Sequence, residues 1–143
     1  MELKKTFPLV SILMPAYNCE NYIKEAVECI LNQTFKNWEL LIADDASTDK
    51  TKILIDSYND PRIKSFHNAL NLGYLKTWNN LISLSKGDFI TFQDADDSCA
   101  VNRIEFLLHA FENNPDIGVI GSNYNRINET GEIIYTSDFV LNH

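Results

Sequence analysis

The sequence predicts an α/β fold built on a mostly parallel, Rossmann-like sheet that is flanked by helices on both faces. Short apolar runs of strand length alternate with segments whose apolar residues recur at helical spacing. No linker, internal repeat or low-complexity tract interrupts this alternation. Strands that are separated by helices usually pair in parallel, and helices then cover both faces of the sheet. We therefore expect a single domain over residues 1–143.

The first half of the chain is predicted to contain three strands and two helices. Apolar runs predict strands at residues 10–14, 38–43 and 63–66. Apolar residues at helical spacing predict a helix over 21–33. A second helix is expected after the second strand, with Ser47 or Thr48 as its N-cap and Asp49 in its first turn.

The second half continues the same alternation. Tyr74, Trp78, Leu81 and Ile82 recur at helical spacing, which predicts a helix that Gly87 can terminate and in which Trp78 belongs to the core. Further elements are expected along the rest of the chain: a strand at 89–92, a helix at 104–111, a strand at 117–121 and a hairpin joining 124–127 to 133–135.

Composition limits the classes of partner. The formal net charge is −8, which disfavours nucleic acid and anionic membrane surfaces. A phosphorylated small molecule remains compatible with this charge, because a bound divalent cation reverses the local sign. The longest apolar stretches are only a few residues, far short of the roughly twenty that a transmembrane helix needs.

The cysteines and the N-terminus indicate the compartment. Cys19, Cys29 and Cys99 are odd in number and form no Cys-x-x-Cys pattern, so we interpret them as reduced packing residues. The first seven residues have no apolar core, so no signal peptide is predicted. We expect a cytoplasmic protein, with peripheral contact at the inner membrane face as the alternative.

Polar residues gather after three of the predicted strands. Residues 15–18 follow the first strand, residues 44–49 the second, and residues 94–97 the strand at 89–92. The carboxyl ends of parallel strands share one edge of a sheet, where ligands bind. Carboxylates that converge there repel one another, which favours binding of a cation. Oxygen ligands select a hard divalent ion, Mg²⁺ or Mn²⁺.

With these segments in their order, the chain resembles family 2 of the nucleotide-sugar glycosyltransferases, which have the GT-A fold. The resemblance covers nearly the whole chain from about Pro8 to the hairpin. A lone D-x-D is weak evidence, but five segments in the family's order are specific. The matching segments are residues 10–18, 33–35, 44–49, 71–73 and 87–97.

The resemblance implies a role for each matching position. Tyr17 would pack near the nucleotide base, and Asp45 would accept a hydrogen bond from it, while Asp44 braces the loop. Asp96 would coordinate the metal, and Asp94 would contact the metal or the ribose. Lys76 lies where many relatives carry a basic residue near the diphosphate, although Trp78 stands where others carry an Arg. The expected nucleotide-sugar and metal ligands are Pro15, Ala16, Tyr17, Asn18, Asp45, Lys76, Asp94, Ala95 and Asp96.

The same resemblance implies an activity and a location for its general base. Family members invert the anomeric centre in one displacement, which needs a general base for the acceptor hydroxyl. In the family this base lies well downstream of the D-x-D, so we expect it beyond residue 143, and the chain looks truncated before an acceptor-binding half. Asp116, Glu129 and Asp138 are candidates by residue type only. The implied partners are a nucleotide-diphosphate sugar, most often a UDP-sugar, and a carbohydrate or lipid-linked acceptor.

Other interpretations stay open at this point. The acidic run at 94–97 could be a solvated loop with a helix cap, and Asp44 and Asp45 could only cap the second helix. The chain could be a non-catalytic nucleotide-binding module. A metal-dependent nucleotidyltransferase usually has a glycine-rich basic loop after its first strand, which residues 15–18 lack. An aspartate-based phosphatase needs its D-x-D directly after the first strand.

Overall fold

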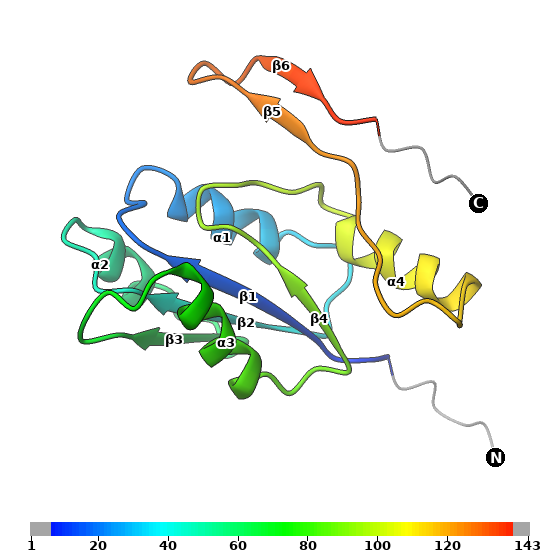
Figure 1. Cartoon of the computed structure of the whole chain (residues 1–143), viewed down its shortest axis with the longest axis horizontal. Coiled ribbons are helices and arrows are strands. Elements are labelled where there is room, and N and C mark those ends of the chain that lie inside the picture. The colour runs from blue at the N-terminus through cyan, green and yellow to red at the C-terminus, as the bar shows by residue number, and fades with distance from the viewer. Residues whose placement is uncertain (1–6, 139–143) are drawn as a thin grey trace. The chain divides into compact units, whose positions relative to one another are not determined.

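A four-stranded parallel sheet forms the centre of the structure, a computed structural model that describes residues 7–138. The strand order is β3-β2-β1-β4, and every neighbouring pair is parallel. This arrangement confirms the predicted α/β fold with a parallel sheet (Figure 1). The strands are β1 (Val10–Ala16), β2 (Trp38–Asp44), β3 (Ile63–His67) and β4 (Phe89–Phe92).

The two central strands are buried along their whole length. All seven residues of β1 and all seven of β2 are buried, as expected for strands that are covered on both faces. Successive side chains point to opposite faces, so Leu13 and its partner Leu41 face the same way. They pack with Leu81 of helix α3 (Tyr74–Leu84) and with Phe66. This cluster fixes α3 against one face of the sheet.

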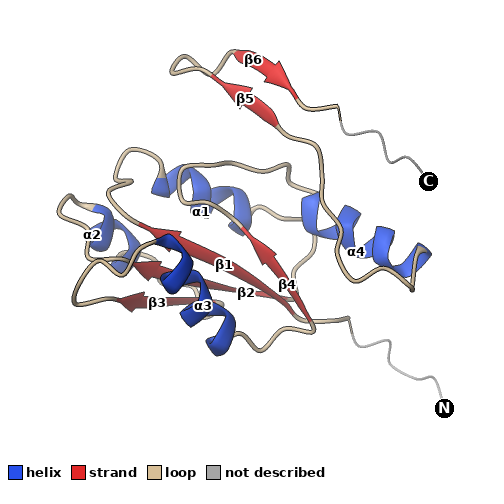
Figure 2. Ribbon diagram, viewed as in Figure 1, coloured by secondary structure: helices blue, strands red, loops and turns tan. Residues whose placement is uncertain are grey.

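The other face is covered by α1 (Ile23–Leu31) and α2 (Thr51–Asp56). Figures 1 and 2 show α3 crossing one face of the sheet, with α1 and α2 behind it. Ile23, Ala26, Val27 and Ile30 form the buried side of α1. These residues recur at helical spacing, which explains why the helix was recognisable in the sequence. The predicted coverage of both faces is confirmed.

The start of β4 is held to β1 and β2 by a buried polar network. Ser11 Oγ donates a hydrogen bond to Glu39 Oε1 (2.7 Å) and accepts one from the Gly87 N–H (2.8 Å). Glu39 Oε1 also accepts from the Lys86 N–H (2.8 Å). Burial raises the pKa of Glu39, but the contacts from Lys64, Ser11 and Lys86 outweigh it and lower the pKa below its ordinary value.

Three local predictions are wrong in detail. Helix α3 ends at Leu84 rather than at Gly87, which instead closes onto Ser11. Helix α2 begins at Thr51, and Asp49 Oδ1 accepts from the Thr51 N–H (2.9 Å). The hydroxyls expected to cap it, those of Ser47 and Thr48, bind the neighbouring loop instead. The segment 117–121 forms no strand, because no neighbouring strand of the described chain pairs with it.

The chain divides into two compact units, Met1–Ile104 and Glu105–His143. Helix α4 (Arg103–Asn113) begins in the first unit and continues in the second. In the second unit β5 (Asn125–Ile127) and β6 (Ile133–Thr136) form the antiparallel hairpin that the sequence predicted. Its turn depends on Asn128 Oδ1, which accepts from the Glu132 N–H (2.9 Å), and on Gly131, whose φ is 82°. Within residues 7–138 no helix is long and apolar enough to cross a bilayer.

Candidate functional site

The strand order places a topological switch point at the carboxyl ends of β1 and β4. The chain runs from β1 outward through β2 to β3, then crosses back to β4 on the other side of β1. Loops that leave the carboxyl ends of strands at such a switch point diverge and leave room for a ligand. The loops after β1 and β4 flank this position, so the site is built from them and from the loop after β2.

The loop after β1 presents Tyr17 at the surface. Pro15 and Ala16 are the buried last residues of β1 and pair with Ala43 and Asp44. Tyr17 follows them and is 50% exposed. Pro15 and Ala16 thus form part of the sheet edge, and Tyr17 is the first side chain available to a ligand.

Asn18 joins the loop after β1 to the loop after β2. Its N–H donates to Ser47 Oγ (3.0 Å), and its Oδ1 accepts from the Thr48 N–H (2.8 Å). Asn18 has a φ of 50°, a left-handed conformation that Asn tolerates better than most residues. Glu20 and Asp49 extend the connection, since the Glu20 N–H donates to Asp49 Oδ2 (3.0 Å). The side chain of Asn18 is therefore occupied in fixing the two loops to each other.

Asp45 fixes the third loop of the site. Its Oδ1 accepts from the Leu72 N–H (2.9 Å) and from Asn68 Nδ2 (2.7 Å), and its Oδ2 accepts from the Gly73 N–H (2.9 Å). Asp45 is only 3% exposed. Burial alone raises its pKa, but these hydrogen bonds outweigh burial and hold the pKa below the ordinary value. The carboxylate stays charged and ties the N-terminus of α3 to the end of β2.

Asp44 braces its own loop, as the resemblance implied. Its Oδ1 accepts from the Ser47 N–H (3.2 Å), and its Oδ2 lies 3.7 Å from His67 Nδ1. The side chain is buried and faces away from solvent. Both members of the acidic pair are thus engaged by the protein.

The acidic residues 94–97 form a tight turn directly after β4. The Asp97 N–H donates to the Asp94 carbonyl (3.2 Å). Gln93 holds the turn from inside, because its Nε2 donates to the carbonyls of Asp97 (2.9 Å) and Asp94 (3.3 Å). The Gln93 N–H continues the ladder to β1 through the Leu13 carbonyl (3.0 Å). The turn is therefore an ordered extension of the sheet, with Asp96 exposed at its surface.

The side chain of Tyr74 connects this turn to α3. Its hydroxyl donates to Asp94 Oδ1 (2.9 Å). The ring lies 5.1 Å from Trp78, measured between centroids, and Trp78 stacks on Phe92 of β4 at 3.7 Å. Because Gly73 binds Asp45 and Tyr74 binds Asp94, the N-cap and the first residue of α3 link the carboxylates of the β2 and β4 loops.

The electrostatics show that the acidic groups act on one another. Burial and the hydrogen bond to Asp94 raise the pKa of Tyr74 to about 12, with further contributions from Asp96 and Asp97. Burial also raises the pKa of Asp97, and the charges of Asp96 and Asp94 raise it further. Burial raises the pKa of Cys19 in the loop after β1, to which Asp49 and Asp96 add. The field of Asp96 thus reaches the loop that carries Tyr17.

Lys76 is not part of this cluster. It follows Tyr74 by two residues on α3, which places it about 160° away around the helix axis. It is exposed, and no hydrogen bond or ion pair within residues 7–138 connects it to the acidic turn. Trp78, two residues further along α3, is half-buried in the aromatic stack. Of the expected ligands, the structure joins Asp45 and Asp94 through α3 and leaves Lys76 apart.

The metal-ligating capacity of the site is limited to carboxylates. Among residues 7–138, no three His, Cys, Asp or Glu side chains are arranged to enclose a metal ion by themselves. Magnesium-type sites commonly use one or two carboxylates together with substrate phosphates and water. Asp94 and Asp96, on a turn whose negative field already raises the pKa of Asp97, fit this kind of shared coordination. Ala95 between them is 5% exposed and packs inward.

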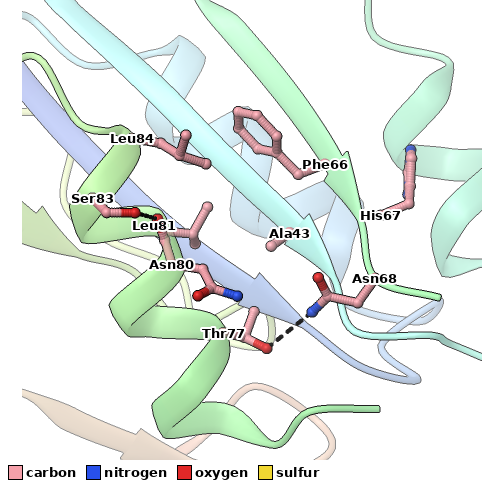
Figure 3. A pocket seen from close by; sticks show the side chains of 9 residues that line it. All are labelled: Ala43, Phe66, His67, Asn68, Thr77, Asn80, Leu81, Ser83 and Leu84. Atoms are coloured by element: carbon pink, nitrogen blue, oxygen red, sulfur yellow. Dashed lines mark hydrogen bonds between the residues drawn. The ribbon is translucent and has the colours of Figure 1, made fainter. Parts of the chain in front are cut away.

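A separate pocket of about 400 Å³ lies between α3 and the ends of β2 and β3. Figure 3 shows Thr77, Asn80 and Leu81 of α3 facing Phe66 and Asn68 across it. Neither the Tyr17 loop nor the acidic turn contributes a residue to its wall. Asn68 connects it indirectly to the site, since its Nδ2 donates both to Asp45 and to Thr77 Oγ1 (3.2 Å).

Two site residues escaped the sequence reasoning. Gln93 was noted only as part of a matching segment, yet it holds the acidic turn. The available signal was a glutamine placed between an apolar strand and an acidic run. The sequence placed Tyr74 on one side of a helix, and nothing in its spacing indicated a hydrogen bond to Asp94, which lies 20 residues away.

Comparison with known proteins agrees with this geometry. The family model described as glycosyl transferase family 2 matches residues 11–142. The UDP-Glc:alpha-D-GlcNAc-diphosphoundecaprenol beta-1,3-glucosyltransferase WfgD of Escherichia coli is 38% identical over 120 residues, which cover 84% of this chain and 47% of that protein. A chondroitin synthase of Escherichia coli is 37% identical over 132 residues, 91% of this chain and 19% of that protein. The chain thus spans about half or less of the length of these relatives.

Solved structures show the same architecture. Staphylococcus aureus TarS 1-349, in a complex with UDP-GlcNAc, has a TM-score of 0.69 and 28% identity, over 73% of this chain and 31% of that one. A mannosyltransferase of Pyrobaculum calidifontis, solved with GDP-Man and Mn²⁺, has a TM-score of 0.63 at 24% identity and supports the fold alone. The expected GT-A fold is confirmed. The chain belongs to glycosyl transferase family 2.

Proposed function

We propose that this chain is the donor-binding part of an inverting glycosyltransferase and holds a nucleotide-diphosphate sugar, most often a UDP-sugar, through a divalent cation at Asp94 and Asp96. The observation that carries the proposal is the ordered acidic turn at the switch point of the sheet, held by Gln93 from inside and by Tyr74 from α3. A solvated loop would need neither contact.

Different residues of the site have different roles in donor binding. Tyr17, exposed at the end of β1, offers a ring against which the base packs, and Pro15 and Ala16 form the floor beneath it. Asp45 reaches the ligand indirectly in this arrangement, because its oxygens already accept from the loop before α3. A nucleotide base that donates a hydrogen bond to Asp45 would have to share one of these carboxylate oxygens with the loop. Asn18 holds the two base-side loops in register.

The leaving group explains the acidic turn. When the sugar–phosphate bond breaks, negative charge develops on the nucleoside diphosphate and needs electrostatic stabilisation. A bound Mg²⁺ or Mn²⁺ supplies that stabilisation as a Lewis acid. The part of this chain is to hold Asp94 and Asp96 oriented toward the diphosphate, and the Tyr74 hydroxyl fixes the Asp94 carboxylate for this purpose.

The acceptor side lies outside the described site. The WfgD relative acts, by its name, on a diphosphoundecaprenol-linked sugar, which supports a lipid-linked or polysaccharide acceptor here. Asp116, Glu129 and Asp138 are exposed residues of the second unit with no matching motif, so we place the general base in a segment beyond residue 143. We infer a cytoplasmic location, with peripheral contact at the inner membrane face, which suits such a donor and acceptor.

Calorimetric titration tests the proposal. UDP, GDP and dTDP are titrated into the chain with and without Mn²⁺, and the titrations are repeated with Asp96→Asn and with Glu25→Gln, an exposed acid of α1, as the matched control. We expect metal-dependent binding of UDP by the wild type and by Glu25→Gln, and a loss of tenfold or more, about 1.4 kcal/mol, in Asp96→Asn. No metal-dependent binding of any nucleotide would refute the donor site, and unchanged binding by Asp96→Asn would refute the metal role.

A transfer assay tests whether this donor-binding part can transfer the sugar without an acceptor-binding half. The 143-residue chain is incubated with UDP-sugar, Mn²⁺ and a diphosphoundecaprenol-linked acceptor, and we expect binding without robust transfer because the base is supplied elsewhere. Efficient transfer by this chain alone would show that the base lies within it.

A further inference from the structure

Two cysteine sulfurs that no proposed function uses lie in contact. Cys29 belongs to α1, and Cys99 follows the acidic turn, 70 residues later in the chain. Their Sγ atoms are 3.3 Å apart, and both are free thiols on half-buried residues. Cys19, the remaining cysteine, is buried elsewhere, and its sulfur accepts a hydrogen bond from the Thr51 hydroxyl. The sequence indicated three reduced packing residues, and the structure brings two of them into contact.

The surrounding hydrogen bonds fix the distance between the two sulfurs. Gln33 Nε2 donates to the Cys29 carbonyl (3.1 Å) on one side and to the Ala100 carbonyl (2.7 Å) on the other. Gln33 Oε1 accepts from the Ile104 N–H (3.1 Å). One buried amide therefore holds the segment after the acidic turn against the end of α1. The close approach of the sulfurs follows from this frame.

The surroundings of the pair favour the thiolate form of Cys99. The hydrogen bond from Cys29 lowers the pKa of Cys99 to about 7, although burial opposes it, and the nearby Arg103 guanidinium adds to the lowering. The same hydrogen bond and burial raise the pKa of Cys29. At neutral pH a large fraction of Cys99 is therefore thiolate, while Cys29 keeps its proton. A thiolate, not a thiol, is the reactive form of cysteine.

We propose that Cys29 and Cys99 are a redox-active dithiol that hydrogen peroxide oxidises to an intramolecular disulfide. A disulfide bond is about 2.05 Å long, so the sulfurs must approach by little more than 1 Å from their 3.3 Å separation. The bond would join α1 covalently to the segment that directly follows Asp94–Asp97. The site takes small oxidants, because the half-buried thiols leave little room for a larger reagent.

The reaction balances in two steps. The Cys99 thiolate attacks one peroxide oxygen, so that an S–O bond forms, the O–O bond breaks, and the departing hydroxide takes up a proton to give water. The Cys29 sulfur then attacks the sulfenic sulfur of Cys99, so that the S–S bond forms and the S–O bond breaks. The leaving hydroxyl departs as a second water with the proton of Cys29. Two electrons pass from the two thiols to one peroxide.

Mass spectrometry of the whole chain tests the proposal. The reduced protein is treated with a small excess of hydrogen peroxide, quenched with N-ethylmaleimide and measured intact. Labelled in denaturant, the oxidised chain should carry one maleimide adduct where the reduced chain carries three, and its mass without adducts should be lower by about 2 Da. Proteolytic mapping should recover the Cys29 and Cys99 peptides joined, and dithiothreitol should restore both thiols. This test needs no substitution, so a variant that fails to fold cannot confuse it.

Three variants assign the roles. Cys19→Ser should oxidise like the wild type, since Cys19 lies outside the pair. Cys29→Ser should leave Cys99 without its partner, so peroxide should add oxygen there, about 16 or 32 Da, instead of forming a disulfide. Cys99→Ser should react far more slowly at Cys29. A disulfide that includes Cys19, a dimer-only product, or an unchanged wild type under conditions that oxidise Cys99 in Cys29→Ser would overturn the proposal.

Discussion

Single side chains determine how the two acidic loops of this protein differ. Asp45 is buried, and its oxygens accept from two backbone N–H groups and an amide of one loop. Asp94 accepts at Oδ1 from the Tyr74 hydroxyl. The first carboxylate therefore organises the protein, while the second keeps capacity for a ligand. Both depend on the start of α3, where Gly73 and Tyr74 are adjacent.

Removing the Tyr74 hydroxyl should weaken donor binding without unfolding the chain. A hydrogen bond to a charged group contributes about 1.5–3 kcal/mol when buried, and Tyr74 is half exposed, so Tyr74→Phe should weaken metal-dependent UDP binding by a few-fold to about tenfold. Calorimetric titration measures the change. Tyr22→Phe, an exposed tyrosine at the start of α1, is the control and should bind normally.

The titration of Tyr74 offers a second measurement at the same residue. Its pKa is raised from 10.0 to about 12, so the protonated ring is favoured in the folded state. The corresponding stability is complete below pH 10 and is lost as pH rises through about 12. Ultraviolet titration of tyrosinate should show this late step. Asp94→Asn should shift it back toward lower pH, and an unshifted step would contradict the bond.

Loss of the Asp45 carboxylate should destabilise the fold. Asp45→Ala removes the acceptor of the Leu72 N–H and of Asn68 Nδ2 and leaves the Gly73 N–H with Asn71 Oδ1 alone, which should lower the free energy of unfolding by about 2–4 kcal/mol. Asp45→Asn keeps one oxygen and should lose less. Urea denaturation measures both. A loss below about 0.5 kcal/mol in Asp45→Ala, the size expected for an exposed control such as Glu25→Ala, would contradict the bracing role.

The pH dependence of this effect has a definite sign. The folded-state pKa of Asp45 lies below the ordinary 3.8, so its contribution to stability is present above pH 3.8 and lost as pH falls through the folded pKa. The stability difference between wild type and Asp45→Asn should therefore shrink under acid conditions. A difference that grows on acidification would show that the carboxylate is not the stabilising form.

Among the elements, those with strong local patterns could be predicted from the sequence. Strands β1 and β2 were recognisable as apolar runs, and α1 showed helical spacing because one side of it is buried. The segment 117–121 has similar apolar content but meets no neighbouring strand in the structure. Whether an apolar run becomes a strand depends on a partner that the local sequence does not reveal.

The candidate site, too, could be predicted from the sequence only in part. The positions of Tyr17, Asp45 and the acidic turn followed from strand ends, which periodicity locates well. Contacts between side chains far apart in sequence did not follow, including those of Gln33 with Ala100 and of Ser11 with Gly87. Such contacts depend on crossings between elements rather than on any local signal. For the same reason the expected cap at Ser47 or Thr48 was wrong, because Asn18 binds both residues.

The loop between α3 and β4 should tolerate no side chain at Gly87. A Cβ there would lie 2.5 Å from the Ser11 backbone nitrogen and 2.7 Å from the Phe89 carbonyl oxygen. Gly87→Ala must therefore shift backbone or break the bond to Ser11, at a cost of about 1–3 kcal/mol in unfolding free energy. Gly118→Ala is the matched control, since nothing lies within 4 Å of its added Cβ. Equal urea midpoints for the two variants would contradict the close packing.

At the scale of the whole molecule, all the residues argued for donor binding belong to the first of the two compact units. Residues 15–18, 45, 74 and 94–97 come from four separate segments of that unit, and hydrogen bonds through Asn18, Asp45 and Tyr74 connect them. The hairpin of β5 and β6 in the second unit contributes none of these contacts. Donor binding should therefore act on one unit and leave the other unchanged.

Hydrogen exchange with UDP and Mn²⁺ tests this separation. Ligand that binds only the folded site lowers the frequency of local opening, by about a hundredfold at a free concentration near 100 times Kd. We expect slower exchange of amides in the loops after β1, β2 and β4 and at the start of α3, and unchanged exchange over residues 124–136. Asp96→Asn should remove the protection, whereas Glu25→Gln should retain it. Comparable protection of the hairpin would show that the donor contacts both units, and the site would then have to include residues of the second.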